Sequence, residues 1–409
     1  MSILAATGGG PVREGCLLRL SREPEDEQRH ISRRLYADGK GLGHIQPQFP
    51  TTSETVEMSN AAGLKKKSEI LRSITSMDDI RRLLKVLPGP DEEAAIQAVK
   101  HDSRLTKPRG SLGRLEEIVL WLSRWQSRDV PVMGRPQSCV FAGNHGIACY
   151  NVSAFPAAVT RQMVENFTRG GAAINQLAGV LGAEVTVRAL HLDQPTQDFT
   201  IEPAMSEASC VEAFCVGFDA VDPDATLLCP GEMGIGNTTS AAAICHLLWG
   251  GRAADWIGIG TGIDKAQYER KVDVVARSYQ LHGDVVTDGL DVLQRVGGLE
   301  IVAMAGAIFG ARWLRIPVML DGFICGAAAA TLFATSRDSL MHCMVGHGSS
   351  EPGHRLLLER IGKRPLLDLD LRLGEGTGAV IAGLIARAAV ACHSGMASFE
   401  DAGVDSGHL

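Results

Sequence analysis

The chain changes its pattern of hydrophobic and polar positions near residue 77, and from there onward the pattern is that of a compact protein. Apolar residues recur with the helical period of about 3.6 over 78–86, 91–101 and 115–125, which predicts three amphipathic helices. Beyond them one theme repeats: a short apolar run, a glycine-rich turn and an alanine-rich helix. Strands that alternate with helices in this way predict an α/β fold with a doubly wound, mainly parallel sheet.

Each predicted strand is followed by a loop that is rich in glycine or polar residues. The apolar runs that we interpret as strands cover residues 138–142, 225–229, 256–259, 317–320, 342–345 and 366–373. The loops at the carboxyl ends of parallel strands converge on one crevice of the sheet. The loops therefore predict a single composite site.

Residues 1–80 lack sustained periodicity and contain a charged run at 22–30, so they predict an extension that is mostly disordered. The extension contains acidic residues and no apolar core segment, so it resembles neither a signal peptide nor a transit peptide. Met58 is an alternative start of the chain, and residues 81–409 form the expected catalytic region.

Composition excludes several classes of protein. Hydrophobic residues make up 45% and charged residues 21% of the 409 positions, as in ordinary soluble proteins. A net charge of −7 argues against a nucleic-acid partner, which needs a basic face. The longest apolar stretch, 301–333, contains Arg312, Arg315 and Asp321, so no membrane span is expected. The ten scattered cysteines indicate reduced thiols of a cytoplasmic protein.

Histidines in the predicted loops raise the question of a metal site. The spacing of His145, His347 and His354 matches no compact zinc pattern, and neither a His-Glu-x-x-His motif nor a Walker lysine loop is present. We therefore expect no metal and no cofactor. Ser349 lies in a Ser-Ser-Glu-Pro sequence that is typical of a helix cap rather than of a nucleophile.

Glu375 is the most informative single residue, because it stands between Gly374 and Gly376 in a loop that joins a strand to an apolar helix. Such loops present backbone amides and a helix dipole to an anion. A carboxylate in that position repels a phosphate, so Glu375 is better suited to act as a base on a neutral or cationic reactant. The alternative is an exposed glutamate on a flexible turn.

The loop at 231–239 has the composition of an anion cradle. Gly234 and Gly236 allow close approach of backbone amides, while Asn237 and Thr238 can cap the next helix and donate hydrogen bonds. The alternative is a capped turn without a ligand.

Three further candidates follow other strands. Gly260 lies in a similar loop, and Lys271 comes two helical turns later, where it could reach a phosphate or remain a solvated lysine. Asp321, followed by Gly322, could bind ribose hydroxyls or cap the following helix.

Taken together, the motifs resemble one family, the nicotinate-nucleotide–dimethylbenzimidazole phosphoribosyltransferases of cobalamin lower-ligand synthesis. The motifs that carry the resemblance lie at 107–116, 145–146, 159–160, 231–239, 271–275, 296–298, 320–323 and 371–378. The resemblance implies transfer of the phosphoribosyl group of nicotinate mononucleotide to 5,6-dimethylbenzimidazole. It also implies a homodimer, with a Rossmann-like large domain at about 131–380 and a small helical domain built from 81–130 and the C-terminal helices.

The resemblance assigns roles to individual residues. Glu375 corresponds to the general base and Glu232 to a second carboxylate of the site. Phosphate and ribose contacts correspond to Gly234, Gly236, Asn237, Thr238, Gly260, Lys271, Asp321, Gly322, Ser349, Gly374 and Gly376. The pocket for the base is expected to contain Phe155, Gln162, Met163 and Leu373.

The chain also departs from the family pattern. Phe155 and Met163 stand where enteric members have Ser and Gln, so dimethylbenzimidazole, another benzimidazole and a purine all remain possible bases. A nucleotide-dependent oxidoreductase is an alternative function, although the dinucleotide motif Gly-x-Gly-x-x-Gly is missing after the first strand. An inactive nucleotide-binding protein is a third possibility.

Overall fold

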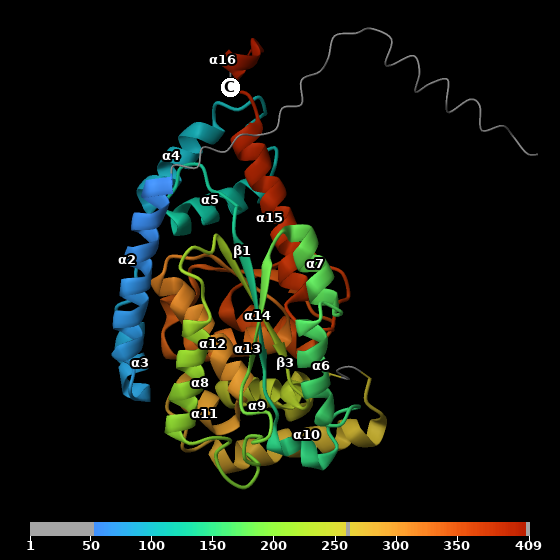
Figure 1. The fold of residues 1–409 in the computed structure, drawn as a ribbon. Coiled ribbons are helices and arrows are strands. Elements are labelled where there is room, and N and C mark those ends of the chain that lie inside the picture. The colour runs from blue at the N-terminus through green and yellow to red at the C-terminus, as the bar shows by residue number, and fades with distance from the viewer. Residues whose placement is uncertain (1–52, 259–261, 406–409) are drawn as a thin grey trace, which may run out of the picture. The chain divides into compact units, whose positions relative to one another are not determined.

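A computed structural model describes residues 53–258 and 262–405 of the chain. The strands are β1 (Pro136–Ala142), β2 (Glu184–Ala189), β3 (Leu227–Met233), β4 (Val318–Leu320), β5 (Cys343–Gly348) and β6 (Pro365–Asp368). They form one sheet in the order β2-β1-β3-β4-β5-β6, and all five neighbouring pairs are parallel. The predicted α/β fold with a parallel sheet is confirmed (Figure 1).

Helices connect and cover the strands. They are α2 (Ser53–Arg72), α3 (Met77–Leu84), α4 (Glu92–Asp102), α5 (Arg114–Gln126), α6 (Ala158–Thr168), α7 (Ala173–Leu181), α8 (Glu207–Asp219), α9 (Asn237–Trp249), α10 (Lys265–His282), α11 (Gly289–Val296), α12 (Leu299–Trp313), α13 (Phe323–Thr335), α14 (Pro352–Ile361), α15 (Thr377–Gly395) and α16 (Phe399–Ala402). Short 3₁₀ helices are η1 (Gly146–Tyr150), η2 (Ala253–Trp256) and η3 (Arg337–Leu340). The three amphipathic helices predicted before the sheet correspond to α3, α4 and α5.

The direction in which the chain moves across the sheet reverses between β1 and β3. From β1 the chain moves outward to β2, then returns to β3 on the other side of β1 and continues through β4, β5 and β6. The connections therefore leave the sheet in opposite directions at this point, and loops that follow the strands can separate there to admit a ligand.

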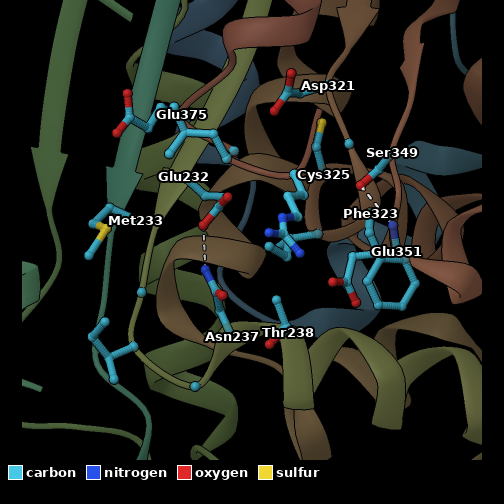
Figure 2. Close-up of a pocket in the computed structure, with 18 of the residues that line it drawn as sticks. Glu232, Met233, Asn237, Thr238, Asp321, Phe323, Cys325, Ser349, Glu351 and Glu375 are labelled. Carbon is cyan, nitrogen blue, oxygen red and sulfur yellow. Dashed lines mark hydrogen bonds between the residues drawn. The ribbon is translucent and has the colours of Figure 1, made fainter. Parts of the chain in front are cut away.

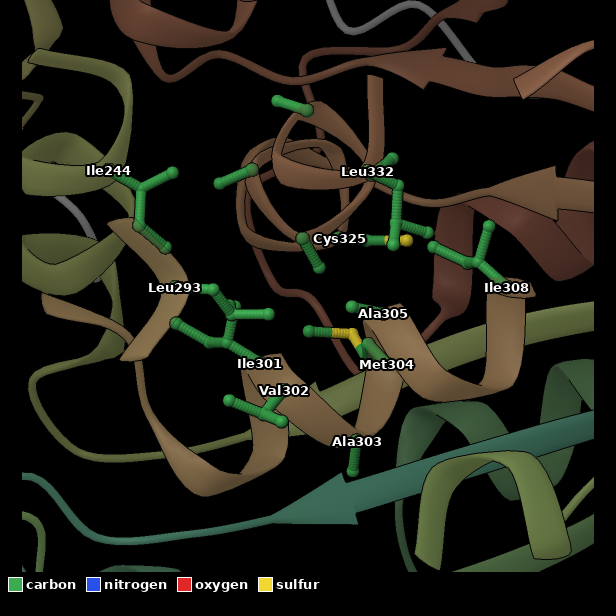
Figure 3. Packing of buried hydrophobic residues seen from close by; sticks show 14 of the residues in the cluster. Ile244, Leu293, Ile301, Val302, Ala303, Met304, Ala305, Ile308, Cys325 and Leu332 are labelled. Carbon is green, nitrogen blue, oxygen red and sulfur yellow. The ribbon is translucent and has the colours of Figure 1, made fainter. Parts of the chain in front are cut away.

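Alternate side chains of the central strands belong to two separate apolar clusters. Phe141 and Leu228 pack in the cluster formed largely by α8, α9, α11, α12 and α13, whereas Val140 and Leu227 pack with α5, α7 and α15. Neighbouring residues of a strand point to opposite faces, so both faces of the sheet are covered. Figure 3 shows the first cluster, where Met304 and Ile308 of α12 lie against α13.

Two glycines allow α8 and α12 to cross closely. A Cβ atom on Gly217 of α8 would overlap the carbonyl of Ala303, and one on Gly306 of α12 would overlap the carbonyl of Phe214. The two helices can approach this closely only without side chains at these positions. The long apolar helix α12 is thereby fixed beside the sheet, and its N-terminal end lies near the carboxyl ends of β1 and β3.

The structure differs from the predicted strands in three places. Residues 256–259 form no strand in their described part, since Trp256 ends η2 and Ile257 and Gly258 are irregular. Strand β6 ends at Asp368, and the alternating leucines beyond it are not buried, with Leu373 51% exposed. Strand β2 was not predicted, because it is a half-exposed edge strand whose apolar residues alternate with polar ones and form no continuous apolar run.

The N-terminal region also differs from the expectation of disorder up to residue 80. Helix α2 begins at Ser53, and Ile70, Ile74 and Met77 are buried in the core. Lys67 Nζ donates a hydrogen bond to the carbonyl of Val221, 3.1 Å away. The run of three lysines at 65–67 obscured the short helical spacing of the apolar residues. The remainder of the expected extension, residues 1–52, lies outside the described residues.

Helix α15 alone among the described helices is long and apolar enough to cross a membrane by length and composition. Half of it is buried inside the protein, where it packs against α5, α7 and β5. It is therefore a core helix. Its C-terminal end meets the segment after α4, where the amide of Thr106 donates to the carbonyl of Ala397 at 3.1 Å (Figure 1).

Candidate active site

A cavity of about 320 Å³ lies at the carboxyl ends of β3, β4 and β5, beside the loop that begins α15 (Figure 2). Four carboxylates line it, from Glu232, Asp321, Glu351 and Glu375. The predicted site residues that line the cavity are Phe155, Met163, Glu232, Gly234, Gly236, Asn237, Thr238, Asp321, Gly322, Ser349, Leu373, Gly374 and Glu375. The tertiary structure thus brings together residues from five loops that are up to 220 positions apart in the chain (375 minus 155).

Three predicted residues within the described part of the chain do not line the cavity, namely Gln162, Lys271 and Gly376. Lys271 is buried behind it, and its Nζ donates to Thr238 Oγ1 at 2.8 Å. Gly376 lies next to Glu375, with its amide turned toward Asp321. Gln162 is exposed on α6 and is not among the residues that line the cavity, and Gly260 lies outside the described residues.

The sequence placed Glu232 in the loop after the strand predicted at 225–229, whereas in the structure it lies inside β3. Its Oε2 accepts a hydrogen bond from Asn237 Nδ2 at the start of α9. Burial, reinforced by the negative charges of Glu300 and Asp321, raises the pKa of Glu232 to about 8. This carboxyl group therefore holds a proton at neutral pH.

Glu375 is 5% exposed and adopts a left-handed backbone conformation with φ 62°. Its Oε2 accepts a hydrogen bond from the amide of Ile174, near the start of α7, at 3.3 Å. Burial and, to a lesser extent, Asp321 raise the pKa of Glu375 above its ordinary value, against the lowering effect of the Ile174 amide. A non-glycine residue in this conformation stores strain, which is common at functional sites.

Two glycines bring the loops of Glu232 and Glu375 into contact. A Cβ on Gly374 would overlap Oε1 of Glu232, and a Cβ on Gly231 would overlap the carbonyl of Glu375. The sequence suggested that glycines near Glu375 free backbone amides for a ligand. The structure shows that these two positions also serve close packing, which brings the backbone of the Glu375 loop against β3 and Glu232.

Asp321 holds the loop that carries Glu375. Its Oδ2 accepts from the amide of Gly376 at 3.3 Å, and its Oδ1 accepts from the amide of Ala379 at 3.0 Å. It therefore caps α15, which is not the helix that follows it in the chain. His347 Nε2 lies 3.5 Å from Oδ1, and although burial opposes a charged imidazole, Asp321 raises the pKa of His347.

The opposite end of the cavity is the N-terminus of α9. Gly236 has φ 99° and precedes Asn237 and Thr238, whose amides begin the helix. Lys271 lies directly behind Thr238, and burial lowers the pKa of its ammonium group to about 8 while Glu351 acts in the opposite direction. A helix N-terminus backed by a lysine is suited to an anion such as a phosphate.

Other cavity residues were not singled out from the sequence as ligand contacts. Glu351, His347 and Arg372 line it as polar groups, and the apolar lining consists of Val159, Met233, Ile235, Phe323, Ile324 and Cys325. The rule that loops after parallel strands converge could have found Glu351 and His347, which follow or end β5. Glu351 is also the N-cap residue of α14, with Pro352 in the first turn, as the Ser-Ser-Glu-Pro sequence had indicated.

No group of three His, Cys, Asp or Glu side chains in residues 53–258 and 262–405 is arranged to hold a metal ion. Of the three histidines considered from the sequence, His347 contacts Asp321, while His354 Nδ1 accepts from the amide of Ser349 at 2.9 Å. His145 lies behind the cavity in contact with Glu300.

Comparison with known proteins identifies the family. Residues 87–404 match the profile of a phosphoribosyltransferase family, DBI_PRT. Nicotinate-nucleotide–dimethylbenzimidazole phosphoribosyltransferase from Ruegeria sp. (strain TM1040) is 54% identical over 338 residues, which are 83% of this chain and 100% of that protein. The enzyme of the same name from Allorhizobium ampelinum is 52% identical over 334 residues, covering 81% of this chain and 98% of its own.

A solved structure agrees with these sequences. The crystal structure of CobT from Thermus thermophilus superimposes with a TM-score of 0.71 and 41% sequence identity, and the match covers 77% of this chain and 100% of that one. The resemblance inferred from the sequence motifs is confirmed. This chain belongs to the nicotinate-nucleotide–dimethylbenzimidazole phosphoribosyltransferase family of enzymes.

Proposed function

We propose that this protein transfers the phosphoribosyl group of nicotinate mononucleotide to 5,6-dimethylbenzimidazole, giving α-ribazole 5′-phosphate and nicotinate, with Glu375 as the general base. The observation that carries this proposal is the pair of buried carboxylates, Glu232 and Glu375, in one cavity with an apolar lining. The family relatives bear the names of both substrates, and this chain spans their full length.

The proposed reaction needs one base and no general acid. A ring nitrogen of the benzimidazole forms a bond to C1′ of the ribose while the bond from C1′ to the nicotinate nitrogen breaks, and its electron pair returns to nicotinate. Nicotinate leaves as a neutral pyridine ring, and the other ring nitrogen of the benzimidazole gives its proton to Glu375. The raised pKa of Glu375 makes it a stronger base.

Glu232 has a different task in this proposal. Its pKa of about 8 gives it a proton at neutral pH, so it can donate a hydrogen bond where Glu375 accepts one. Glu232 as a donor and Glu375 as an acceptor can therefore hold the ring from two sides.

The two ends of the cavity suit the two substrates. The N-terminus of α9, with Thr238 and Lys271, is proposed to hold the phosphate, which keeps the anion away from Glu375. Phe155, Met163 and Leu373 are proposed to contact the incoming base together with other apolar residues. Gln162 is exposed and lies outside this lining, and its contact with the base stays a prediction.

The chemistry of the pocket predicts its preference among the possible bases. Phe155 and Met163 offer apolar contact and no amide group to pair with the exocyclic amine of a purine. We expect kcat/KM for dimethylbenzimidazole to exceed that for adenine by at least about tenfold, since an unpaired polar group costs more than about 1 kcal/mol. Competition between the two bases, followed by mass analysis of the products, measures this ratio, and a preference for adenine would contradict it.

The function is tested by incubating the purified protein with nicotinate mononucleotide, with and without dimethylbenzimidazole. Release of nicotinate that requires the base, with a product of ribazole phosphate mass, is the expected result. Release without a base would indicate a hydrolase, and no release with any benzimidazole or purine would contradict the transferase and leave a binding or redox role.

The raised pKa of Glu232 also predicts how stability depends on pH. Because this pKa is about 8 in the folded protein and 4.5 in an isolated side chain, folding takes up a proton at Glu232 within that window. The free energy of unfolding therefore falls as pH rises, with a contribution of about 1.4 kcal/mol per pH unit. Glu232→Gln should remove this contribution and stabilise the protein above pH 8. Urea unfolding at pH 5 to 9 measures it, and equal slopes for both proteins would contradict it.

The finer organisation is also part of the proposal. We infer a Rossmann-like, doubly wound large domain, and a small helical domain in which α4 and α5 join the C-terminal part of α15. We further propose that the protein acts in the cytoplasm as a homodimer, in the assembly of the nucleotide loop of cobalamin. Sedimentation equilibrium of the purified protein tests the dimer.

A further inference from the structure

A buried network of polar side chains lies directly behind the cavity. His145 follows β1, and its Nε2 lies 2.5 Å from Oε1 of Glu300 in the first turn of α12. The Nδ1 atom of His145 lies 2.9 Å from Oγ of Ser240, in α9. All three side chains are buried, and the acid and imidazole of the pair are 0% exposed.

Glycines allow this network to approach the cavity closely. A Cβ on Gly234, which lines the cavity, would lie 2.5 Å from Oε1 of Glu300 and 3.2 Å from Nδ2 of Asn237. A Cβ on Gly143 would lie 2.5 Å from Oε2 of Glu300, and a Cβ on Gly298 would overlap the ring of His145. The pair of His145 and Glu300 is thus separated from the cavity only by backbone.

Asn237 connects the network to Glu232. Its Nδ2, which lies beside Gly234, donates the hydrogen bond that Oε2 of Glu232 accepts, and Gly234 also lies against Oε1 of Glu300. Glu300 has a second oxygen, Oε2, that is buried without a hydrogen-bond partner among the described residues. A buried carboxylate that is incompletely satisfied exerts its charge through a low dielectric, where repulsion of a neighbouring carboxylate is strong.

We propose that Glu300 is a positioning residue that supports Gly234 and disfavours ionisation of Glu232 during the proposed ribosyl transfer, while His145 and Ser240 hold Glu300 in place. The proposal rests on the proposed function for its role in catalysis. The other groups that face Glu232 are Asp321 after β4, Glu375 before α15 and Asn237 of α9. Glu300 is the largest of the charged contributions that raise the pKa of Glu232, after burial itself.

The sign of the effect follows from charge. Glu300→Gln keeps the shape of the side chain and removes its negative charge, so Glu232 should lose its proton at a lower pH. Glu300→Asp keeps the charge and should leave the pH midpoint of Glu232 ionisation near that of the wild type. Ser240→Ala removes the hydrogen-bond partner of His145 Nδ1, so the imidazole is held less firmly against Glu300. The Glu300 carboxylate is then less well satisfied, its repulsion of Glu232 is stronger, and the midpoint should move to higher pH.

The experiment is the pH profile of kcat/KM for nicotinate release from pH 5 to 10, for the wild type and these three variants. We expect Glu300→Gln to lower the midpoint of the Glu232-dependent limb by about one pH unit. Glu207→Gln serves as the matched control, because this carboxylate accepts the amide of Met77, away from the cavity. Glu207→Gln should leave the profile unchanged.

A midpoint for Glu300→Gln that equals that of the wild type or of Glu300→Asp would overturn the proposal. If Glu300→Gln does not fold, the pH profile of Ser240→Ala provides the test. An unchanged midpoint in that variant overturns the proposal. If the wild type releases no nicotinate, the proposed function fails by itself. The network is then tested by how steeply the free energy of unfolding falls with pH. Between pH 5 and 8 this fall should be less steep in Glu300→Gln than in the wild type. An equally steep fall in both proteins would overturn the proposal.

Discussion

Replacement of Glu375 by Gln is expected to lower kcat by about 10²–10⁴, because a positioned general base contributes a factor of that size. Gln has nearly the same shape as Glu and cannot accept the proton from the benzimidazole nitrogen. KM for nicotinate mononucleotide should change only a few-fold, because the proposed phosphate and ribose contacts come from α9, Lys271 and Asp321. Steady-state kinetics of nicotinate release measure both quantities.

The fold should remain intact in Glu375→Gln. The side-chain amide oxygen of Gln can still accept the hydrogen bond from the amide of Ile174. Thermal unfolding and calorimetric binding of nicotinate mononucleotide provide the controls, and both should resemble those of the wild type. Turnover equal to that of the wild type would show that Glu375 is not the base.

Gly231→Ala is expected to lower kcat by at least about 100-fold, since a displacement of about 1 Å at a catalytic group can cost that much. The new Cβ would overlap the carbonyl of Glu375, which is backbone and cannot rotate away. Either the loop of Glu375 or strand β3, which carries Glu232, must shift. One methyl group therefore displaces at least one of the two carboxylates. Kinetics of nicotinate release measure the loss of activity, and thermal unfolding measures the change in stability.

Gly89→Ala is a matched control for this experiment. A Cβ on Gly89 meets nothing within 4 Å, and neither Gly89 nor Gly231 has a positive φ, so alanine is allowed by the backbone at both positions. Activity and stability of Gly89→Ala should equal those of the wild type. Full activity in Gly231→Ala would contradict the proposal that close packing of the two loops positions the carboxylates.

Much of the site could be predicted because parallel strands follow a simple rule. Glu375, Asp321 and Ser349 each follow a run of apolar residues, and loops at such positions meet at one edge of the sheet. The predicted strand boundaries were wrong where exposed residues interrupt the pattern of buried apolar positions. Leu373 belongs to an irregular segment and not to a strand, and β2 at the edge of the sheet has no continuous apolar run by which it could be recognised.

Glu300 shows why part of the site could not be predicted. In the sequence it is one charged residue at the start of the apolar helix α12, where an acid near a helix N-terminus is ordinary. Its contact with His145 joins positions 155 residues apart. The same holds for Asp321, whose hydrogen bonds to Gly376 and Ala379 cap a helix more than 50 positions further along the chain.

The sequence by itself determined the α/β class, the positions of most strands and the family, because periodic burial and local motifs are properties of short segments. The tertiary structure decided which of these segments touch. It placed Glu232 within β3, raised its pKa to about 8 through burial beside Glu300 and Asp321, and packed the loop of Glu375 against it at Gly231 and Gly374. Burial and charge repulsion depend on distances between remote segments, and no local pattern of residues contains them.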